Sequence, residues 1–206
     1  MIGFYNYTVI LTYAGTFFGF MGIICVLEGN LKEALICLMI AGFCDMFDGK
    51  IASTMKRTKQ EKRFGIQIDS LSDLVCFGVL PALIVYRCSD KERIYVVACV
   101  IYLLCALIRL AWFNVDEEER QAREEHGREC YLGLPVTTSA VLLPLFMATA
   151  ARLKLPSGDI APLILFFITA AFISPFTLKK PGLLGKIILM LCGLTGLILV
   201  LTGGVV

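Results

Sequence analysis

Two stretches decide the architecture of this chain, Asp45-Met46-Phe47-Asp48-Gly49-Lys50-Ile51-Ala52 and Gly65-Ile66-Gln67-Ile68-Asp69-Ser70-Leu71-Ser72-Asp73. They place acids inside, or at the ends of, segments that are otherwise apolar enough to cross a membrane. On a helix, residues three or four apart lie on one face, so Asp45 pairs with Asp48 and Asp69 with Asp73. A carboxylate at membrane depth costs about 2.5–3.5 kcal/mol on insertion scales, so these acids indicate a functional site.

Four converging acids repel one another unless a positive charge lies between them. The two stretches contain one cation, Lys50, and it is offset from the acidic faces. A divalent metal is the better partner. Oxygen ligands suit magnesium, manganese or calcium, and the lack of a His or Cys cluster argues against zinc.

The composition is that of a membrane protein. Of 206 residues, 58% are hydrophobic, and the mean hydropathy is +0.80. The apolar stretches are too long and too many for one globular core, so we expect lipid to be the solvent for much of the surface. No basic run is interleaved with aromatic residues, which gives no indication of nucleic-acid binding. The nine cysteines are odd in number and form no CxxC pair, which favours buried thiols over disulfides.

The apolar runs predict an all-α, polytopic bundle of six to seven transmembrane helices, forming one integral membrane domain over residues 1–206. The expected spans are 8–27, 33–52, 66–86, 94–114, 134–151, 160–176 and 183–203. The span at 183–203 is an addition to a core of about 8–175. With the N-terminus in the cytoplasm, the basic loops 54–65, 115–133 and 177–182 share the inner side. We therefore expect a multi-pass protein of the cell membrane with the acids facing the cytoplasm.

The spacing Asp45-x-x-Asp48-Gly49-x-x-Ala52, then Gly65-x-x-x-Asp69-x-x-x-Asp73, resembles the signature of the CDP-alcohol phosphotransferases. The resemblance implies a membrane enzyme, a homodimer, that uses two divalent ions, Mg²⁺ or Mn²⁺. Asp45 and Asp69 would bridge both ions, Asp48 would complete one site, and Asp73 would complete the other and act as the general base. It further implies a CDP-lipid site, whose residues would include Thr12, Gly49, Ala52 and Gly65.

Three further stretches resemble the integral-membrane phosphatidylserine synthases within this family. They are Asp69-Ser70-Leu71-Ser72-Asp73 with the following Phe77-Gly78 and Pro81-Ala82, then Arg109-Leu110-Ala111-Trp112-Phe113-Asn114, and Gly133-Leu134-Pro135. The resemblance implies CDP-diacylglycerol as donor and L-serine as acceptor, with Arg109, Asn114, Gly133 and Pro135 as candidates for the serine pocket.

The chain departs from the family pattern at two positions. The family usually has an arginine after the motif alanine, where this chain has Ser53, so Lys56 or Arg57 is a candidate to supply the missing charge at the CDP-lipid site. Trp112 likewise stands where the subfamily has a second arginine. Both changes remove a guanidinium, whose fork suits phosphate or carboxylate recognition.

Two alternatives remain open on the sequence. Another acceptor, glycerol 3-phosphate or inositol phosphate, needs extra basic residues for its phosphate. A cation or proton transporter also places acids in the membrane, although no inverted repeat is evident.

Overall fold

The computed structural model describes the chain except for residues 1–2, 90–91, 123–129, 180–181 and 204–206. Its elements in chain order are the 3₁₀ helix η1 (Tyr7–Val9), α1 (Ile10–Glu28), α2 (Leu31–Ala52), α3 (Lys59–Asp73), the π-helix η2 (Leu74–Val79), α4 (Leu80–Cys88), α5 (Arg93–Ala122), β1 (Cys130–Leu132), the 3₁₀ helix η3 (Val136–Thr138), α6 (Ser139–Arg152), α7 (Ser157–Ile173), β2 (Thr177–Lys179) and α8 (Leu183–Thr202).

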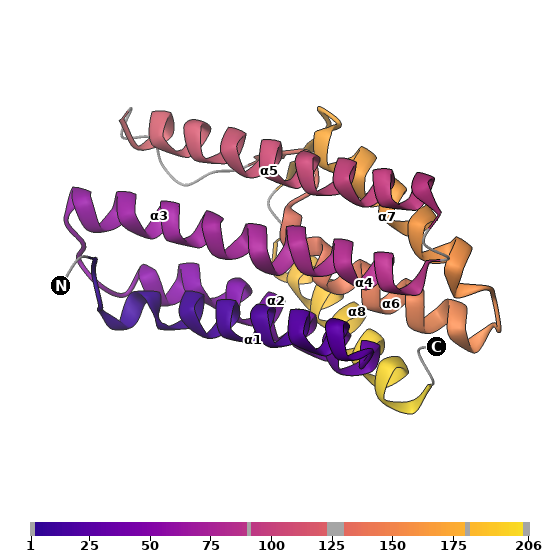
Figure 1. The fold of residues 1–206 in the computed structure, drawn as a ribbon. Coiled ribbons are helices and arrows are strands. Elements are labelled where there is room, and N and C mark those ends of the chain that lie inside the picture. Colours follow the sequence, from indigo (N-terminus) through magenta and orange to yellow (C-terminus); the bar gives the residue numbers. More distant parts are fainter. Residues whose placement is uncertain (1–2, 90–91, 123–129, 180–181, 204–206) are drawn as a thin grey trace.

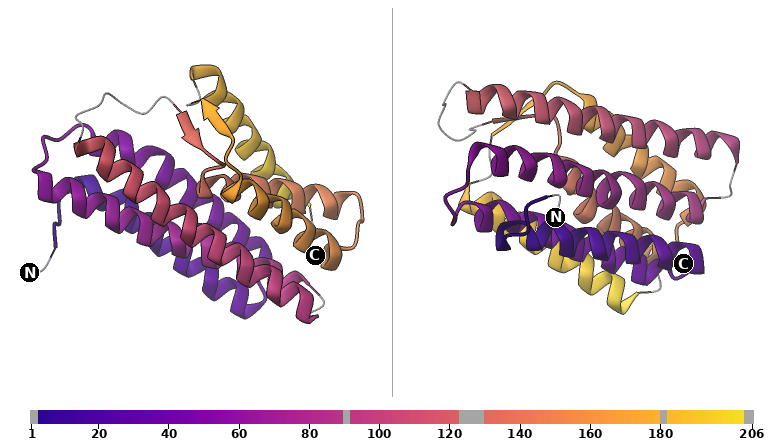
Figure 2. Two further views of the ribbon diagram at one scale, coloured as in Figure 1. Left: turned by 90° about the horizontal axis from the view of Figure 1, so that it is seen from above. Right: turned by 60° about the vertical axis from the view of Figure 1, so that its left-hand side comes forward.

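The long helices form a bundle in which α3, η2 and α4 run on as one rod through the middle (Figure 1). Helices α1 and α2 pack against each other along their length, and α5 packs against α7. Helix α6 packs against both α7 and α8, and these three helices gather on one side of the bundle (Figure 2). The core has large, fully buried side chains from several helices, including Leu38, Ile84, Tyr102 and Leu143.

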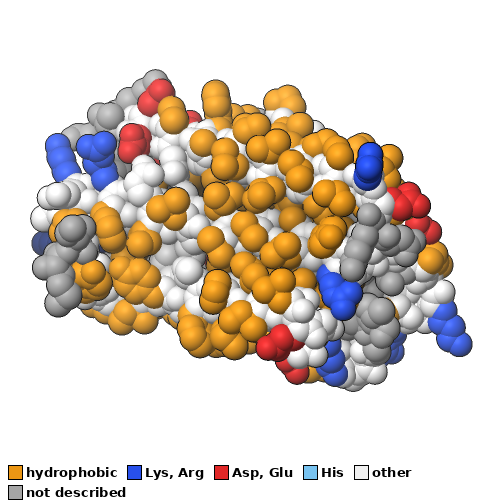
Figure 3. Space-filling view, in the orientation of Figure 1, with side chains coloured by type: hydrophobic (Ala, Val, Ile, Leu, Met, Phe, Trp, Pro, Cys, Tyr) orange, Lys and Arg blue, Asp and Glu red, His pale blue; other side chains and the backbone are white. Residues whose placement is uncertain are grey.

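The surface fits a lipid environment. Three helices of the described chain are long and apolar enough to cross a membrane, Tyr7–Glu28, Lys59–Cys88 and Arg93–Arg120. Shorter apolar helices cover Val136–Arg152, Gly158–Ile173 and Ile187–Thr202. Hydrophobic side chains cover the middle of the face in Figure 3, and the charged side chains visible there lie toward its ends. The chain is an integral membrane protein.

The π-helix follows directly on Asp73. In an α-helix the N–H of residue 81 would bond to the carbonyl of Phe77, but Pro81 has no N–H to give. The hydroxyl of Tyr102 on α5 donates to that carbonyl instead, at 2.6 Å, from a fully buried position. The rod thus changes its helical register one turn beyond the acids without leaving this carbonyl unpaired.

The predicted helical bundle is confirmed, with two differences in detail. Helix α5 continues to Ala122, so part of the polar stretch after residue 114 is helical. Strands β1 and β2 pair antiparallel, with Tyr131 opposite Leu178, and this small ribbon was not predicted. Each strand has three residues, which is too short for an alternating pattern to be visible. Residues 123–129 and 180–181, in two of the loops assigned to the inner side, lie outside the described residues.

Candidate active site

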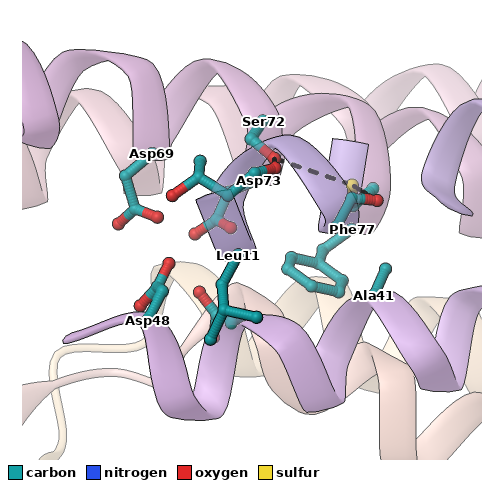
Figure 4. Close-up of a pocket in the computed structure, with 11 residues that line it drawn as sticks. Leu11, Ala41, Asp48, Asp69, Ser72, Asp73 and Phe77 are labelled. Carbon is teal, nitrogen blue, oxygen red and sulfur yellow. Dashed lines mark hydrogen bonds between the residues drawn. The ribbon is translucent and has the colours of Figure 1, made fainter. Parts of the chain in front are cut away.

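The two acid pairs face each other across one pocket. Asp45 and Asp48 come from the last turns of α2, and Asp69 and Asp73 from the last turns of α3. Figure 4 shows Asp69 and Asp73 pointing from α3 toward the α2 helix that carries Asp48. The other residues that line the pocket are small, apolar or hydroxyl-bearing, and they are Leu11, Thr12, Gly15, Ala41, Ser72, Cys76 and Phe77. The two helical faces predicted from the spacing are confirmed.

The carboxylates are close enough to share a cation. One oxygen from each of Asp45, Asp48 and Asp69 lies within 4.8 Å of the others. Asp48 also contacts Asp69, and Asp45 contacts Asp73. No lysine or arginine is among the residues that line the pocket, and Lys50 lies over the ring of Phe47, 5.4 Å from its centroid. Hard oxygen donors at this density fit divalent ions such as Mg²⁺ or Mn²⁺.

Hydroxyl groups surround the carboxylates. Thr12 on α1 lines the pocket together with Asp48, and Thr137 in η3 lies near Asp45. The hydroxyl of Thr16 donates to Ser72 at 2.7 Å. Thr12 was among the residues predicted for the site, whereas Thr137 was not, although it lies two residues beyond the predicted Pro135.

Most of the residues predicted for the CDP-lipid site lie around the C-terminal end of α2 and the start of α3. Gly49 is exposed, and an added Cβ would meet nothing within 4 Å, so its lack of a side chain serves no packing within the chain. Ser53 is exposed and its hydroxyl donates to the carbonyl of Lys50 at 2.6 Å. Lys56 is exposed and Ala52 half-buried.

Arg57 is the basic residue of this loop that reaches α3. It is half-buried, and its Nη1 lies 3.1 Å from the position that a Cβ on Gly65 would occupy. Gly65, Asp69 and Asp73 follow one another at intervals of four along α3, and therefore share one face. The guanidinium thus lies one helical turn from Asp69.

The residues predicted for the acceptor fall into two groups beside the acid pocket. Arg109 on α5 is 8% exposed, and its Nε donates to the carbonyl of Leu134 at 3.3 Å. Asn114 accepts a hydrogen bond from Ser70, the neighbour of Asp69, at 2.6 Å. The structure therefore joins Arg109 to the Gly133–Pro135 turn, and Asn114 to the acid-bearing helix. None of these four residues is among those that line the described acid pocket.

The Gly133–Pro135 turn is held by the end of α7 and by the segment that follows it. Gly133 has φ +68°, and a Cβ there would lie 2.9 Å from the carbonyl oxygen of Phe172. The N–H of Gly133 donates to the backbone carbonyl of Phe176 at 2.8 Å. The N–H of Leu134 donates to the backbone carbonyl of Ala171 at 3.0 Å. These contacts explain why glycine opens this turn.

The family model of the CDP-alcohol phosphatidyltransferases matches residues 5–174, and the chain belongs to this family. Enzymes of this family generally use divalent metals, which agrees with the aspartate cluster.

Its relatives include enzymes named for serine. The archaetidylserine synthase of Methanothermobacter thermautotrophicus is 31% identical over 143 residues, which are 69% of this chain and 58% of the relative. The CDP-diacylglycerol–serine O-phosphatidyltransferase of Mycobacterium tuberculosis strain H37Rv is 32% identical over 124 residues, 60% of this chain and 42% of the relative. The enzyme of that name from Saccharomyces cerevisiae is 32% identical over 150 residues, 69% of this chain and 53% of the relative. The chain spans about half the length of these relatives.

Proposed function

We propose that this protein is a phosphatidylserine synthase, which transfers the phosphatidyl group of CDP-diacylglycerol to the hydroxyl of L-serine and releases CMP. The observation that carries the proposal is the pocket in which four aspartates converge from α2 and α3. Serine as the acceptor is supported by the relatives, which are named archaetidylserine synthase and CDP-diacylglycerol–serine O-phosphatidyltransferase.

Asp45, Asp48, Asp69 and Asp73 would hold two divalent ions, Mg²⁺ or Mn²⁺. When bound, such ions neutralise phosphate charge and align the attacking and leaving oxygens. Asp73 would accept the proton of the serine hydroxyl while that oxygen forms a bond to the phosphorus of the phosphatidyl group. The bond from this phosphorus to CMP breaks, and CMP leaves with the electron pair.

The CDP-lipid would lie along the open side of α2. The empty space at Gly49 leaves room for the nucleotide, with Thr12 and Ala52 beside it. Of the two basic candidates, Arg57 is the better placed to meet a phosphate, because it is half-buried against Gly65 while Lys56 is exposed. Arg57 would then supply the charge that Ser53 lacks.

The serine carboxylate needs a cation, and Arg109 would supply it from its buried position next to Leu134. Asn114 would complete the pocket through its bond to Ser70, beside the metal ligand Asp69. Gly133 and Pro135 would shape its wall.

We further propose that residues 1–206 act as one domain in a homodimer in the cell membrane, with the site open to the cytoplasm. In this orientation the basic loop that carries Lys56 and Arg57 would meet the anionic inner leaflet.

The test is an assay of the purified protein with radiolabelled serine, CDP-diacylglycerol, and either Mg²⁺ or Mn²⁺. We expect label to enter the lipid phase with one CMP released per serine incorporated, and chelation or Asp69→Asn to abolish both signals. Asp69→Asn should still insert and purify like the parent protein.

Competing acceptors and donors belong in the same experiment. Incorporation of glycerol 3-phosphate or inositol phosphate in place of serine would move the protein elsewhere in the family. A CDP-linked archaetidyl lipid deserves its own arm, because one relative is an archaetidylserine synthase. Ion flux in liposomes without CMP release for any alcohol would favour a transporter.

A further inference from the structure

The acid-bearing helix α3 is joined to α1 by a pair of hydroxyl groups. Ser72 lies between Asp69 and Asp73 on α3, is buried, and is one of the residues that line the acid pocket. The hydroxyl of Thr16 on α1 donates to Ser72 at 2.7 Å, and the Ser72 hydroxyl in turn donates to the backbone carbonyl of Thr12 at 3.4 Å. A polar contact therefore joins the two helices at the level of the acids.

A second contact with α1 lies one turn further along the rod. The thiol of Cys76 in η2 donates to the backbone carbonyl of Gly15 at 3.4 Å, and the hydroxyl of Ser72 lies 3.9 Å from the same sulfur (dashed line in Figure 4). A Cβ on Gly19 would lie 2.5 Å from this sulfur and 3.3 Å from the Cα of Cys76. There is no room for a side chain at Gly19, so α1 and the rod are in direct contact beside the pocket.

The rotation of α3 about its own axis determines where its acids point. Neighbouring residues of an α-helix are about 100° apart around the axis, so the side that carries Ser72 turns together with the side that carries Asp69 and Asp73. Ser72 faces α1, while the two acids point toward α2 (Figure 4). A rotation that released Ser72 would swing both carboxylates relative to Asp45 and Asp48.

We infer that Thr16 is a positioning residue for the metal site, because its hydrogen bond to Ser72 sets the rotation of α3 and so directs Asp69 and Asp73 toward bound divalent ions. The inference rests on the metal-binding part of the proposed function. Hydrogen bonds from outside the ligand set orient metal ligands generally, and losing such a partner typically weakens metal affinity by about 10–100-fold. Since this bond acts on the helix rather than on a ligand itself, we expect the lower end of that range.

Thr169 provides the matched control. It is a buried threonine of α7, and its hydroxyl donates to the carbonyl of Leu165, four residues earlier, at 2.7 Å. The Thr16 hydroxyl has the same contact within its own helix, 2.8 Å from the carbonyl of Thr12. Of these two threonines, Thr16 alone also bonds to another helix within the described residues. The substitutions to compare are Thr16→Val, which removes the hydroxyl at nearly constant shape, Thr16→Ser, which keeps it, and Thr169→Val.

The measurement is Mn²⁺ binding to the purified protein in detergent, with free Mn²⁺ followed by electron paramagnetic resonance and no substrate present. We expect Thr16→Val to weaken Mn²⁺ binding by about tenfold, and Thr16→Ser and Thr169→Val to stay within about twofold of the parent. Because no alcohol or CDP-lipid is present, the result is independent of whether serine is the acceptor.

A cycle with the partner residue separates this hydrogen bond from a general disturbance of the helices. Ser72→Ala removes the other hydroxyl and should weaken Mn²⁺ binding to a similar degree. The variant with both Thr16→Val and Ser72→Ala should bind Mn²⁺ about as well as the weaker of the two single variants, because neither hydroxyl acts without the other. Two unrelated disturbances would instead multiply their losses of affinity.

Unaltered Mn²⁺ binding in Thr16→Val would overturn the inference and leave the proposed function standing, as would an equal loss in Thr169→Val or multiplied losses in the cycle. No saturable Mn²⁺ binding by the parent protein would overturn the inference together with the metal-binding part of the proposed function. If Thr16→Val does not yield a monodisperse protein, Thr16→Ala is measured in its place, with the same outcomes deciding.

Discussion

At the residue scale, the four aspartates differ in their neighbours. Asp48 and Asp69 contact each other, and Thr12 lines the pocket beside Asp48. Asp73 contacts Asp45 and lies one turn further along α3, toward Phe77, which also lines the pocket. This position sets Asp73 apart as the base in the proposed reaction.

Asp73→Asn keeps the shape of the side chain and removes the acceptor for the serine proton. We expect kcat to fall by about two to four orders of magnitude, because proton transfer by a positioned side chain typically contributes that factor. Binding of the CDP-lipid should be largely kept. Turnover is measured by CMP release and binding by calorimetry on one preparation. Turnover near that of the parent protein would make Asp73 a metal ligand only.

The aspartates could be predicted from the sequence because both acids of a pair belong to one helix, whose period relates spacing to face. The position of Thr137 near Asp45 could not, because these residues are brought together only by packing of η3 against α2. The same limit applies to Arg57 and Gly65. Arg57 was a candidate from the sequence, but its contact with Gly65 on α3 depends on the path that residues 53–58 take between the two helices.

At the element scale, the loop between α2 and α3 is shaped by the start of α3. Thr58 and Glu61 form a capping box, in which the Thr58 N–H donates to Glu61 at 2.8 Å and the Glu61 N–H donates to Thr58 at 3.2 Å. The side chain of Asn6 also donates to Glu61, at 3.3 Å. The cap thus fixes the loop immediately after Arg57.

Arg57→Ala should raise the KM for the CDP-lipid by about 10–100-fold, since a hydrogen bond to a charged group is worth about 1.5–3 kcal/mol. Lys56→Ala, from the exposed neighbour, is the matched control and should change this KM little. Ser53→Arg in the Arg57→Ala background should recover part of the loss. An equal rise in the CDP-lipid KM for Lys56→Ala would mean that the loop attracts the lipid through its net charge rather than through one contact. No effect of either variant would mean that other groups hold the phosphates.

Gly65 offers an independent check of the same contact. A Cβ there would lie 3.1 Å from Nη1 of Arg57, so Gly65→Ala must shift the guanidinium by a few tenths of an ångström. We expect a smaller rise in the CDP-lipid KM than for Arg57→Ala, and no further rise when both changes are combined. Additive effects would show that Gly65 contributes by a separate route.

The hydrogen bond between Tyr102 and the π-helix should contribute to the stability of the fold. Tyr102→Phe leaves the Phe77 carbonyl without its partner in a place where water cannot replace it, which we expect to cost about 1–3 kcal/mol. Tyr95→Phe is the matched control, since Tyr95 lies on the same helix and its hydroxyl bonds to the exposed Asp159 at 3.0 Å. The unfolding temperature in detergent should fall clearly for Tyr102→Phe and little for Tyr95→Phe. Equal unfolding temperatures for the two variants would contradict the assigned role of Tyr102.

At the whole-molecule scale, the bundle could be predicted because each apolar run is long enough to show its own helix. The interruption at η2 could not, because it depends on Tyr102 from another helix as well as on Pro81. The extension of α5 to Ala122 was not evident either, because residues 115–122 are too polar to continue the apolar run.

The rod from α3 to α4 also relates the two ends of the molecule. Lys59–Cys88 comprises 30 residues, which at 1.5 Å per residue is about 45 Å, longer than the ~30 Å hydrocarbon core of a bilayer. The loop before α3 and the turn after α4 lie at opposite ends of the bundle (Figure 1). We therefore expect Lys56 and Glu92, both exposed, to lie on opposite sides of the membrane.

This arrangement predicts the outcome of labelling with a membrane-impermeant maleimide. Lys56→Cys should react only after the cells are opened, because the end that bears the acids faces the cytoplasm in the proposed orientation, where serine is available. Glu92→Cys should react in intact cells. The parent protein, with its own cysteines, gives the background for both. Labelling of Lys56→Cys from outside, with Glu92→Cys protected, would reverse the orientation and place the acid pocket on the outer side. Labelling of both variants from the same side would contradict a membrane-spanning rod altogether.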